Sequence, residues 1–239
     1  MLYAVSRNRR LLLLGAALAA AAIVVVALIV IGSGGDAKST ATTPQPGATT
    51  TTALTELFAG VPQHGDTLGK ATAPATLLVF EDPQCPFCRE WSLGALPTAI
   101  DEFVKTGRVK LAWRGIEIIG PNSEPGLRAA YAAAKQNRLW NFVDQLYRRQ
   151  GGENSGWITD SLLREAASAA GVNAGKMLAA SSSAAVTAQL QRAATEEQQF
   201  RVGGTPTFVL VRPPAVPVQL RLSSLDRTTF AATLSSALR

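Results

Sequence analysis

The chain has 239 residues, of which 47% are hydrophobic, and it carries a formal net charge of +6. This length allows one medium-sized domain with appended segments. Because no basic run is interleaved with aromatic residues, the positive charge does not indicate nucleic-acid binding.

Residues 11–31 form an unbroken run without a polar side chain, directly after three arginines in residues 1–10. A run of this length spans the hydrocarbon core of a bilayer as a helix, and the arginines predict a cytoplasmic N-terminus. A cleaved signal peptide is the alternative, although its apolar region is usually only about 7 to 15 residues long. We therefore expect a single transmembrane helix that contacts membrane lipid and leaves the rest of the chain extracytoplasmic.

Residues 32–56 are rich in Gly, Ser, Thr and Pro, with few apolar side chains beyond alanine and proline. Such a composition cannot bury enough surface to offset the entropy of ordering. The segment is predicted to be a flexible linker to a folded domain that begins at residue 57.

The domain is expected to begin with a short strand at 57–63, a turn at 65–70 and an apolar strand at 76–80. His64, the only histidine of the chain, follows the first of these strands in a loop. It could lie near Cys85 and tune its thiolate, but a lone histidine in a loop is more often simply solvated.

The only two cysteines occur as Cys85-Pro86-Phe87-Cys88, where the strand is followed by a segment with helical periodicity. A thiolate at a helix N-terminus has a lowered pKa, so Cys85 is expected to be the exposed nucleophile. Pro86 suits the first helical turn, and Cys88 lies one turn later, within reach of a disulfide. A structural disulfide across two residues would stabilise little, and no metal site is expected with so few ligands.

The remaining pattern alternates between strands and helices. Gly94 and Pro97 are predicted to kink the helix after Cys88. A strand is expected at 109–114, helices at 126–149 with a break near 136–137, at 160–170, at 174–181 and at 184–200, antiparallel strands at 207–212 and 218–222, and a final amphipathic helix. Trp140, Phe142, Val143, Leu146 and Tyr147 recur at helical spacing and are predicted to be core residues.

The chain resembles the DsbA-like thiol-disulfide oxidoreductases over about residues 57–239. The resemblance rests on three segments, Phe80 to Cys88, the lead-in Gly65 to Pro74, and Val202-Gly203-Gly204-Thr205-Pro206-Thr207-Phe208. A C-x-x-C joined to a Gly-Thr-Pro-Thr after a helical segment is a specific combination. The resemblance implies an α/β thioredoxin fold with an α-helical subdomain inserted at about 122–183.

The resemblance also implies the chemistry. The pair Cys85 and Cys88 would exchange disulfides with exported proteins, without a cofactor. A cis Thr205–Pro206 bond, together with Pro86 and Phe87, would form the substrate-binding surface. A quinone-linked membrane oxidase would reoxidise the pair, as it does in relatives.

Two departures from the family pattern concern the environment of the cysteines. Many relatives carry a buried acid six residues before the first cysteine, where this chain has Val79; Glu81 and Asp82 are nearer and are candidates for the same role. The residues between the cysteines are Pro-Phe and do not include the histidine of strongly oxidising relatives. We therefore expect a less oxidising pair.

Two other functions stay open. One is a reductase or isomerase on the same fold, although residues 33–56 are too short and polar for the dimerisation domain of a dimeric isomerase. The other is a copper-handling or redox-inert binding protein. Copper chaperones of this fold usually space their cysteines by three residues and add a histidine near the C-terminal strands, and this chain has neither feature.

Overall fold

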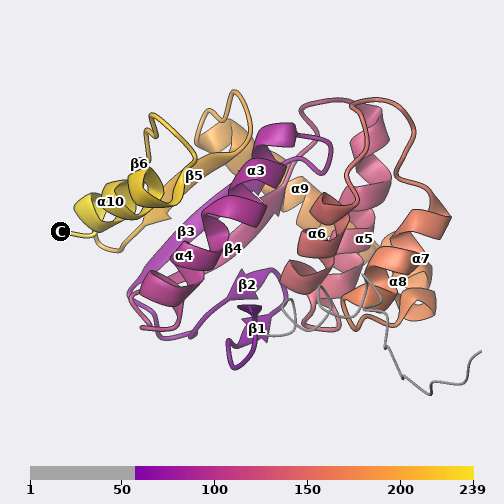
Figure 1. The fold of residues 1–239 in the computed structure, drawn as a ribbon, viewed down its shortest axis with the longest axis horizontal. Helices are drawn as coiled ribbons and strands as arrows, with labels where there is room; N and C mark the ends of the chain where they lie inside the picture. The colour runs from indigo at the N-terminus through magenta and orange to yellow at the C-terminus, as the bar shows by residue number, and fades with distance from the viewer. Residues whose placement is uncertain (1–56) are drawn as a thin grey trace, which may run out of the picture. The chain divides into compact units, whose positions relative to one another are not determined.

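A six-stranded sheet in the order β1-β2-β4-β3-β5-β6 is the framework of residues 57–239, which the computed structural model describes (Figure 1). The strands are β1 (Gln63–His64), β2 (Thr67–Leu68), β3 (Ala75–Glu81), β4 (Val109–Gly115), β5 (Thr207–Val211) and β6 (Val218–Gln219). β3 and β4 run parallel, and every other neighbouring pair is antiparallel. The strands expected at 76–80, 109–114 and 207–212 are therefore confirmed.

The two central strands are apolar because helices cover both faces of the sheet. On one face, Trp91 of α3 (Pro86–Gly94), Phe208 of β5 and Phe230 of α10 (Arg227–Ala237) form an aromatic cluster, with ring centroids 5.0 to 5.7 Å apart. On the other face, Phe200 after α9 (Ala184–Gln199) contacts Phe80 edge-on. The end of β3 is thereby held rigidly, and Cys85 follows it directly.

The segment after Cys88 is interrupted where a kink was expected. α3 ends at Gly94, and α4 (Leu96–Ala99) and the π-helical η1 (Ile100–Val104) follow. Pro97 lies in the first turn of α4, where its missing N–H leaves no bond unmade. Together these helices form the crossover from β3 to the parallel strand β4.

A group of helices separates β4 from β5 and borders the cysteine helix. It comprises η2 (Pro121–Ser123), α5 (Glu124–Ala134), α6 (Leu139–Arg148), α7 (Asp160–Ala169), α8 (Ala174–Ser181) and α9. The expected break lies between α5 and α6, where Asn137 has a φ of 54°. Thr159 caps α7 by accepting a hydrogen bond from the Leu162 N–H, and Gly171 follows α7 with a φ of 69°. All five predicted core residues of α6 are buried.

Two expectations differ from the structure, and two lie outside the residues that it describes. The prediction of a strand at 57–63 is wrong. Most of this segment is a turn, in which the Val61 N–H donates to the Phe58 carbonyl and Gly60 has a φ of 70°. The strand expected at 218–222 pairs over only two residues. The transmembrane helix at 11–31 and the linker at 32–56 lie outside the described residues, and among residues 57–239 no helix has both the length and the apolar character to cross a membrane.

The aromatic cluster supplies the first prediction. Phe230 is fully buried against Trp91 and Phe208. Phe230→Ala should therefore lower the free energy of unfolding by about 3 to 5 kcal/mol in urea denaturation. Val216→Ala is the control, since Val216 is 82% exposed, and it should stay within about 0.5 kcal/mol of the wild-type chain. Equal effects of the two substitutions would contradict this description of the core.

Candidate active site

Cys85 is the N-cap residue of α3 and not part of its first turn. Its backbone is extended, with φ −73° and ψ 119°, and Pro86 takes the first helical position. The Cys88 N–H donates to the Cys85 Sγ at 3.4 Å. Sulfur therefore stands where a serine or aspartate oxygen would cap an ordinary helix, and it accepts a backbone hydrogen bond that favours the thiolate.

The second wall of the site is the loop that precedes β5. The Thr205–Pro206 bond in this loop is cis, as expected. The Cys85 S–H donates to the Thr205 carbonyl oxygen, with Sγ and O 3.2 Å apart, although the two residues are 120 positions apart in the chain. The Thr205 hydroxyl is buried and forms no hydrogen bond with any described residue.

The two thiols of this reduced pair differ strongly in acidity. The pKa of Cys85 is lowered to about 6, first by a hydrogen bond from the Cys88 side chain and then by the neighbouring Thr205 side chain and by backbone N–H groups, against the opposing effect of burial. Burial, with the thiolate and carboxylate nearby, raises the pKa of Cys88 well above its ordinary value. At neutral pH the pair is one thiolate and one thiol.

The accessibility of Cys85 differs from the expectation. Cys85 was expected to be exposed, yet it is 3% exposed, and Cys88 is completely buried. The contact with the Thr205 carbonyl explains the difference, because it brings the loop against the sulfur. Pro86 and Phe87 are exposed beside it, and Phe87 at 60% is one of three exposed large apolar side chains among residues 57–239.

Glu81 is a completely buried carboxyl group close to the cysteine pair. Its two oxygens accept hydrogen bonds from the Ser92 hydroxyl at 3.1 Å and the Trp113 indole N–H at 2.7 Å. Ser92 lies one helical turn after Cys88, so the carboxyl group lies beneath the thiols. Burial raises the pKa of Glu81 to about 8, and the nearby Cys85 charge contributes.

Asp82 anchors the loop that carries the cysteines. Its carboxylate accepts hydrogen bonds from the backbone N–H groups of Gln84, Ile118 and Ile119, at 2.8, 2.8 and 2.9 Å, and from the Ser123 hydroxyl. Four donors leave little capacity for a further partner. The carboxylate thus fixes the strand-to-helix turn against the segment that leads into η2.

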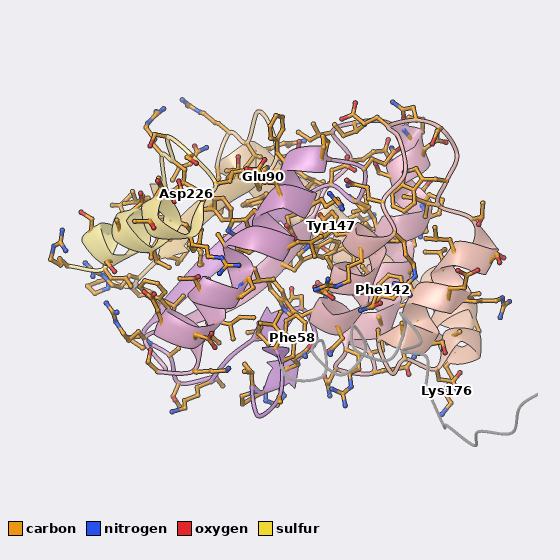
Figure 2. All side chains as sticks on the ribbon, in the orientation of Figure 1. Phe58, Glu90, Phe142, Tyr147, Lys176 and Asp226 are labelled. Atoms are coloured by element: carbon orange, nitrogen blue, oxygen red, sulfur yellow. The ribbon has the colours of Figure 1, made fainter. Side chains whose placement is uncertain are left out.

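Sequence reasoning missed the contribution of the end of α6. The Gln150 side-chain amide donates to the carbonyl oxygens of Pro83 at 2.8 Å and Cys85 at 3.0 Å. The Tyr147 hydroxyl, where α6 faces α3, donates to the Asp82 carbonyl at 3.2 Å (Figure 2). No motif could have revealed Gln150, whereas the helical spacing of Ser92 from Cys88 was a usable signal.

His64 is not brought to the cysteines by any observed contact. It is an exposed residue of the edge strand β1, paired with Thr67 and not placed in a loop. The contacts that lower the pKa of Cys85 come from Cys88, Phe87 and Thr205. Among residues 57–239 there is also no cluster of three or more His, Cys, Asp or Glu side chains that could hold a metal ion.

A strand, a helix N-cap cysteine, a second cysteine one turn later and a facing cis-proline loop define a thioredoxin-fold redox site. A family model described as Thioredoxin matches residues 63–211, more than half of the chain. The chain belongs to the thioredoxin family.

Particular relatives point to one branch of this family. The chain is 36% identical over 110 residues to the probable disulfide bond formation protein D of Bacillus cereus, covering 45% of this chain and 50% of that protein. It is 28% identical over 102 residues to the disulfide bond formation protein D of Bacillus subtilis, covering 42% and 46%. The matches therefore span about half the length of these curated relatives.

Solved structures show the same fold over a larger share. Oxidised BdbD from Bacillus subtilis aligns with a TM-score of 0.62 at 20% identity, covering 74% of this chain and 97% of that one. DsbA from Chlamydia trachomatis aligns with a TM-score of 0.56 at 20% identity, covering 72% and 88%. The fold is thus of the DsbA-like type, with its helices inserted between the two halves of the sheet.

The acidity of Cys85 gives a second prediction. Alkylation of the reduced chain should label Cys85 much faster than Cys88, with a rate that rises to a plateau around a midpoint near pH 6. In Cys88→Ala the midpoint should move up, because the largest contribution to the lowered pKa is lost. The two labels are separated by mass spectrometry of the digested protein. Equal rates at both cysteines would contradict the assignment.

Proposed function

We propose that the protein is a thiol-disulfide oxidoreductase that oxidises cysteines of exported proteins. The observation that carries the proposal is the position of the Cys85 sulfur, which lies between the helix N-terminus at Cys88 and the carbonyl of Thr205 beside a cis-proline. The hydrogen bonds from Cys88 lower the pKa of the Cys85 thiol, and the sulfur lies against a loop whose backbone can bind an extended peptide.

The reaction follows thiol-disulfide exchange. A substrate thiolate attacks the Cys85 Sγ of the oxidised pair, the Cys85–Cys88 bond breaks, and the Cys88 sulfur leaves with the electron pair and takes up a proton. A second substrate thiolate then attacks the substrate sulfur of the mixed disulfide, and Cys85 leaves as a thiolate. The substrate loses two electrons and the cysteine pair gains them.

The cis-proline loop is the proposed substrate-binding surface. A substrate in extended conformation would pair with the backbone of Thr205 next to Pro206, while Pro86 and the exposed Phe87 supply apolar contact. The Thr205 carbonyl lies 3.2 Å from the Cys85 Sγ, so a substrate chain paired with this backbone would hold its own cysteine beside the reactive sulfur.

Glu81 is the proposed partner of Cys88 for proton transfer. A buried carboxyl group whose pKa lies near 8 exchanges a proton readily at neutral pH, unlike an exposed glutamate. Its hydrogen bond to Ser92 places it one turn from Cys88, the leaving group in substrate oxidation. Asp82 would act only by holding the loop, and His64 has no assigned part.

The acidity of Cys85 supports the oxidising direction. A reduced form that is stabilised as a thiolate makes the disulfide a stronger oxidant. The Cys85 pKa of about 6 is below the roughly 7 of thioredoxin and above the roughly 3.5 of DsbA. The pair would therefore oxidise substrates, but less strongly than DsbA. The Bacillus relatives carry the name disulfide bond formation protein, which agrees with this direction.

The cellular setting is also a proposal. An anchor at 11–31 and a linker at 32–56 would keep the catalytic domain outside the cell membrane and near it. An oxidase must be reoxidised after each turnover, and a quinone-linked membrane protein would be the partner that accepts the two electrons. A reductase or isomerase role remains the second candidate, because the same site runs in either direction according to its reduction potential.

The proposal is tested by oxidative refolding of a reduced protein that contains several cysteines. The oxidised chain should accelerate disulfide formation, and Cys85→Ser should abolish the acceleration. Cys88→Ala should accumulate as mixed disulfides, because its Cys85 thiolate attacks a disulfide already formed in the substrate, releases one substrate thiolate, and has no Cys88 to resolve the new bond. A matched control is Ser236→Ala on α10, which leaves both cysteines and their contacts in place. Acceleration that survives Cys85→Ser would contradict the mechanism.

A further inference from the structure

The turn between β5 and β6 exposes apolar side chains that are not buried in the core. Apart from Phe87, the exposed large apolar side chains among the described residues are Val216 and Val218, at 82% and 53%. Every residue of 213–218 is exposed, and three of the six are prolines. Such a cluster on a folded domain marks a contact surface more often than a single exposed residue does.

Strand register places this turn at the end of the sheet opposite Cys85. Val211, the last residue of β5, pairs with Thr76 near the start of β3, and Thr76 pairs with Lys110 of β4. Cys85 instead follows the other end of β3. At about 3.3 Å per residue, β3 alone separates the two ends by roughly 20 Å.

Positive charge gathers at the same end. Arg212 begins the turn and donates to the Leu238 carbonyl, and Lys110 Nζ donates to the Ala71 carbonyl at 2.8 Å. Arg108 precedes β4, and Lys70 packs close to Gly107 beside it. We call these four cations, with Val216 and Val218, the basic end.

Acidic side chains do little to offset this charge. None of the four cations forms an ion pair with another described residue. The acidic residues on the neighbouring η1 are Asp101 and Glu102, and Asp101 is already paired with Lys105 at 2.7 Å. From residue 198 to residue 225 the chain contains no Asp or Glu.

We propose that the basic end docks on the surface of an anionic lipid bilayer, with Val216 and Val218 in the headgroup region and the four cations facing lipid phosphates. Basic residues beside an apolar tip are the pattern that binds such surfaces. The turn offers valine, alanine and proline but no aromatic residue, whereas protein hot spots are enriched in Trp and Tyr. Docking does not require the proposed anchor at 11–31, but the anchor would raise the local lipid concentration.

Docking in this way would orient the redox site. Because Cys85 lies at the far end of β3, its thiol would face away from the bilayer, toward polypeptides that have left the membrane. The proposal rests on an exported location, which is part of the proposed function, but it does not depend on the direction of electron flow.

The test is hydrogen exchange of the full chain reconstituted with vesicles. Amides in 212–222 should exchange more slowly with vesicles of phosphatidylcholine and phosphatidylglycerol than with phosphatidylcholine alone. The double variant Lys70→Gln, Arg108→Gln should lose this protection, by about fivefold in the docking equilibrium for each cation removed. Lys176→Gln with Arg164→Gln is the matched control, because these exposed cations lie on α8 and α7, two helices on the far side of α6 from the sheet (Figure 1).

Each outcome decides the proposal. Equal exchange rates in the two kinds of vesicle would overturn it. Equal protection by soluble polyglutamate without lipid would also overturn it, because the partner would then be an acidic polymer or protein. If the control variant also lost the protection, the effect would depend on net charge alone, and the basic end would not be the docking site. Refolding activity measured on the same samples separates these failures from a failure of the redox function.

Discussion

The contact between the Cys85 sulfur and its two neighbours is the constraint on which the site depends. One neighbour is the first turn of α3, whose free N–H groups favour negative charge, and the other is the loop of Thr205 and the cis Pro206. The hydrogen bonds from Cys88 make the sulfur acidic, and the loop of Thr205 leaves it nearly buried. The sheet supplies this geometry, because β3 and β5 are adjacent and antiparallel, so the end of β3 that leads to Cys85 meets the start of β5.

Glu81 and Asp82, the two acids next to the cysteine loop, have different roles because different hydrogen-bond donors surround them. Asp82 receives four hydrogen bonds, which hold the loop, and Glu81 receives two in a fully buried position, where its pKa rises to about 8. Glu81 differs in pKa from an ordinary glutamate because it is buried and no cation of residues 57–239 lies beside it to stabilise its charge. Glu81 is the last residue of β3 and Asp82 follows it, so the two neighbouring carboxyl groups meet different hydrogen-bond donors.

Much of this arrangement could be predicted from residue patterns, and the exceptions have physical reasons. The apolar runs of β3, β4 and β5, the helix caps at Thr159 and Gly171 and the pairing of a C-x-x-C with Thr205-Pro206 are local signals. The burial of Cys85 was not predictable, since it depends on a contact across 120 residues. The apolar stretch from Leu57 to Val61 looked like a strand, yet Phe58 and Val61 pack into the core from a turn. The donors to Glu81 come from Ser92 and Trp113, which only the folded chain brings together.

The central claim is that this geometry makes the Cys85–Cys88 pair an oxidant of protein thiols. The most direct measurement is its reduction potential, determined with the full chain equilibrated in glutathione buffers at neutral pH. The account predicts a value of roughly −120 to −180 mV, the range of DsbA and protein disulfide isomerase. A value near −270 mV, that of thioredoxin, would contradict it and make the protein a reductase.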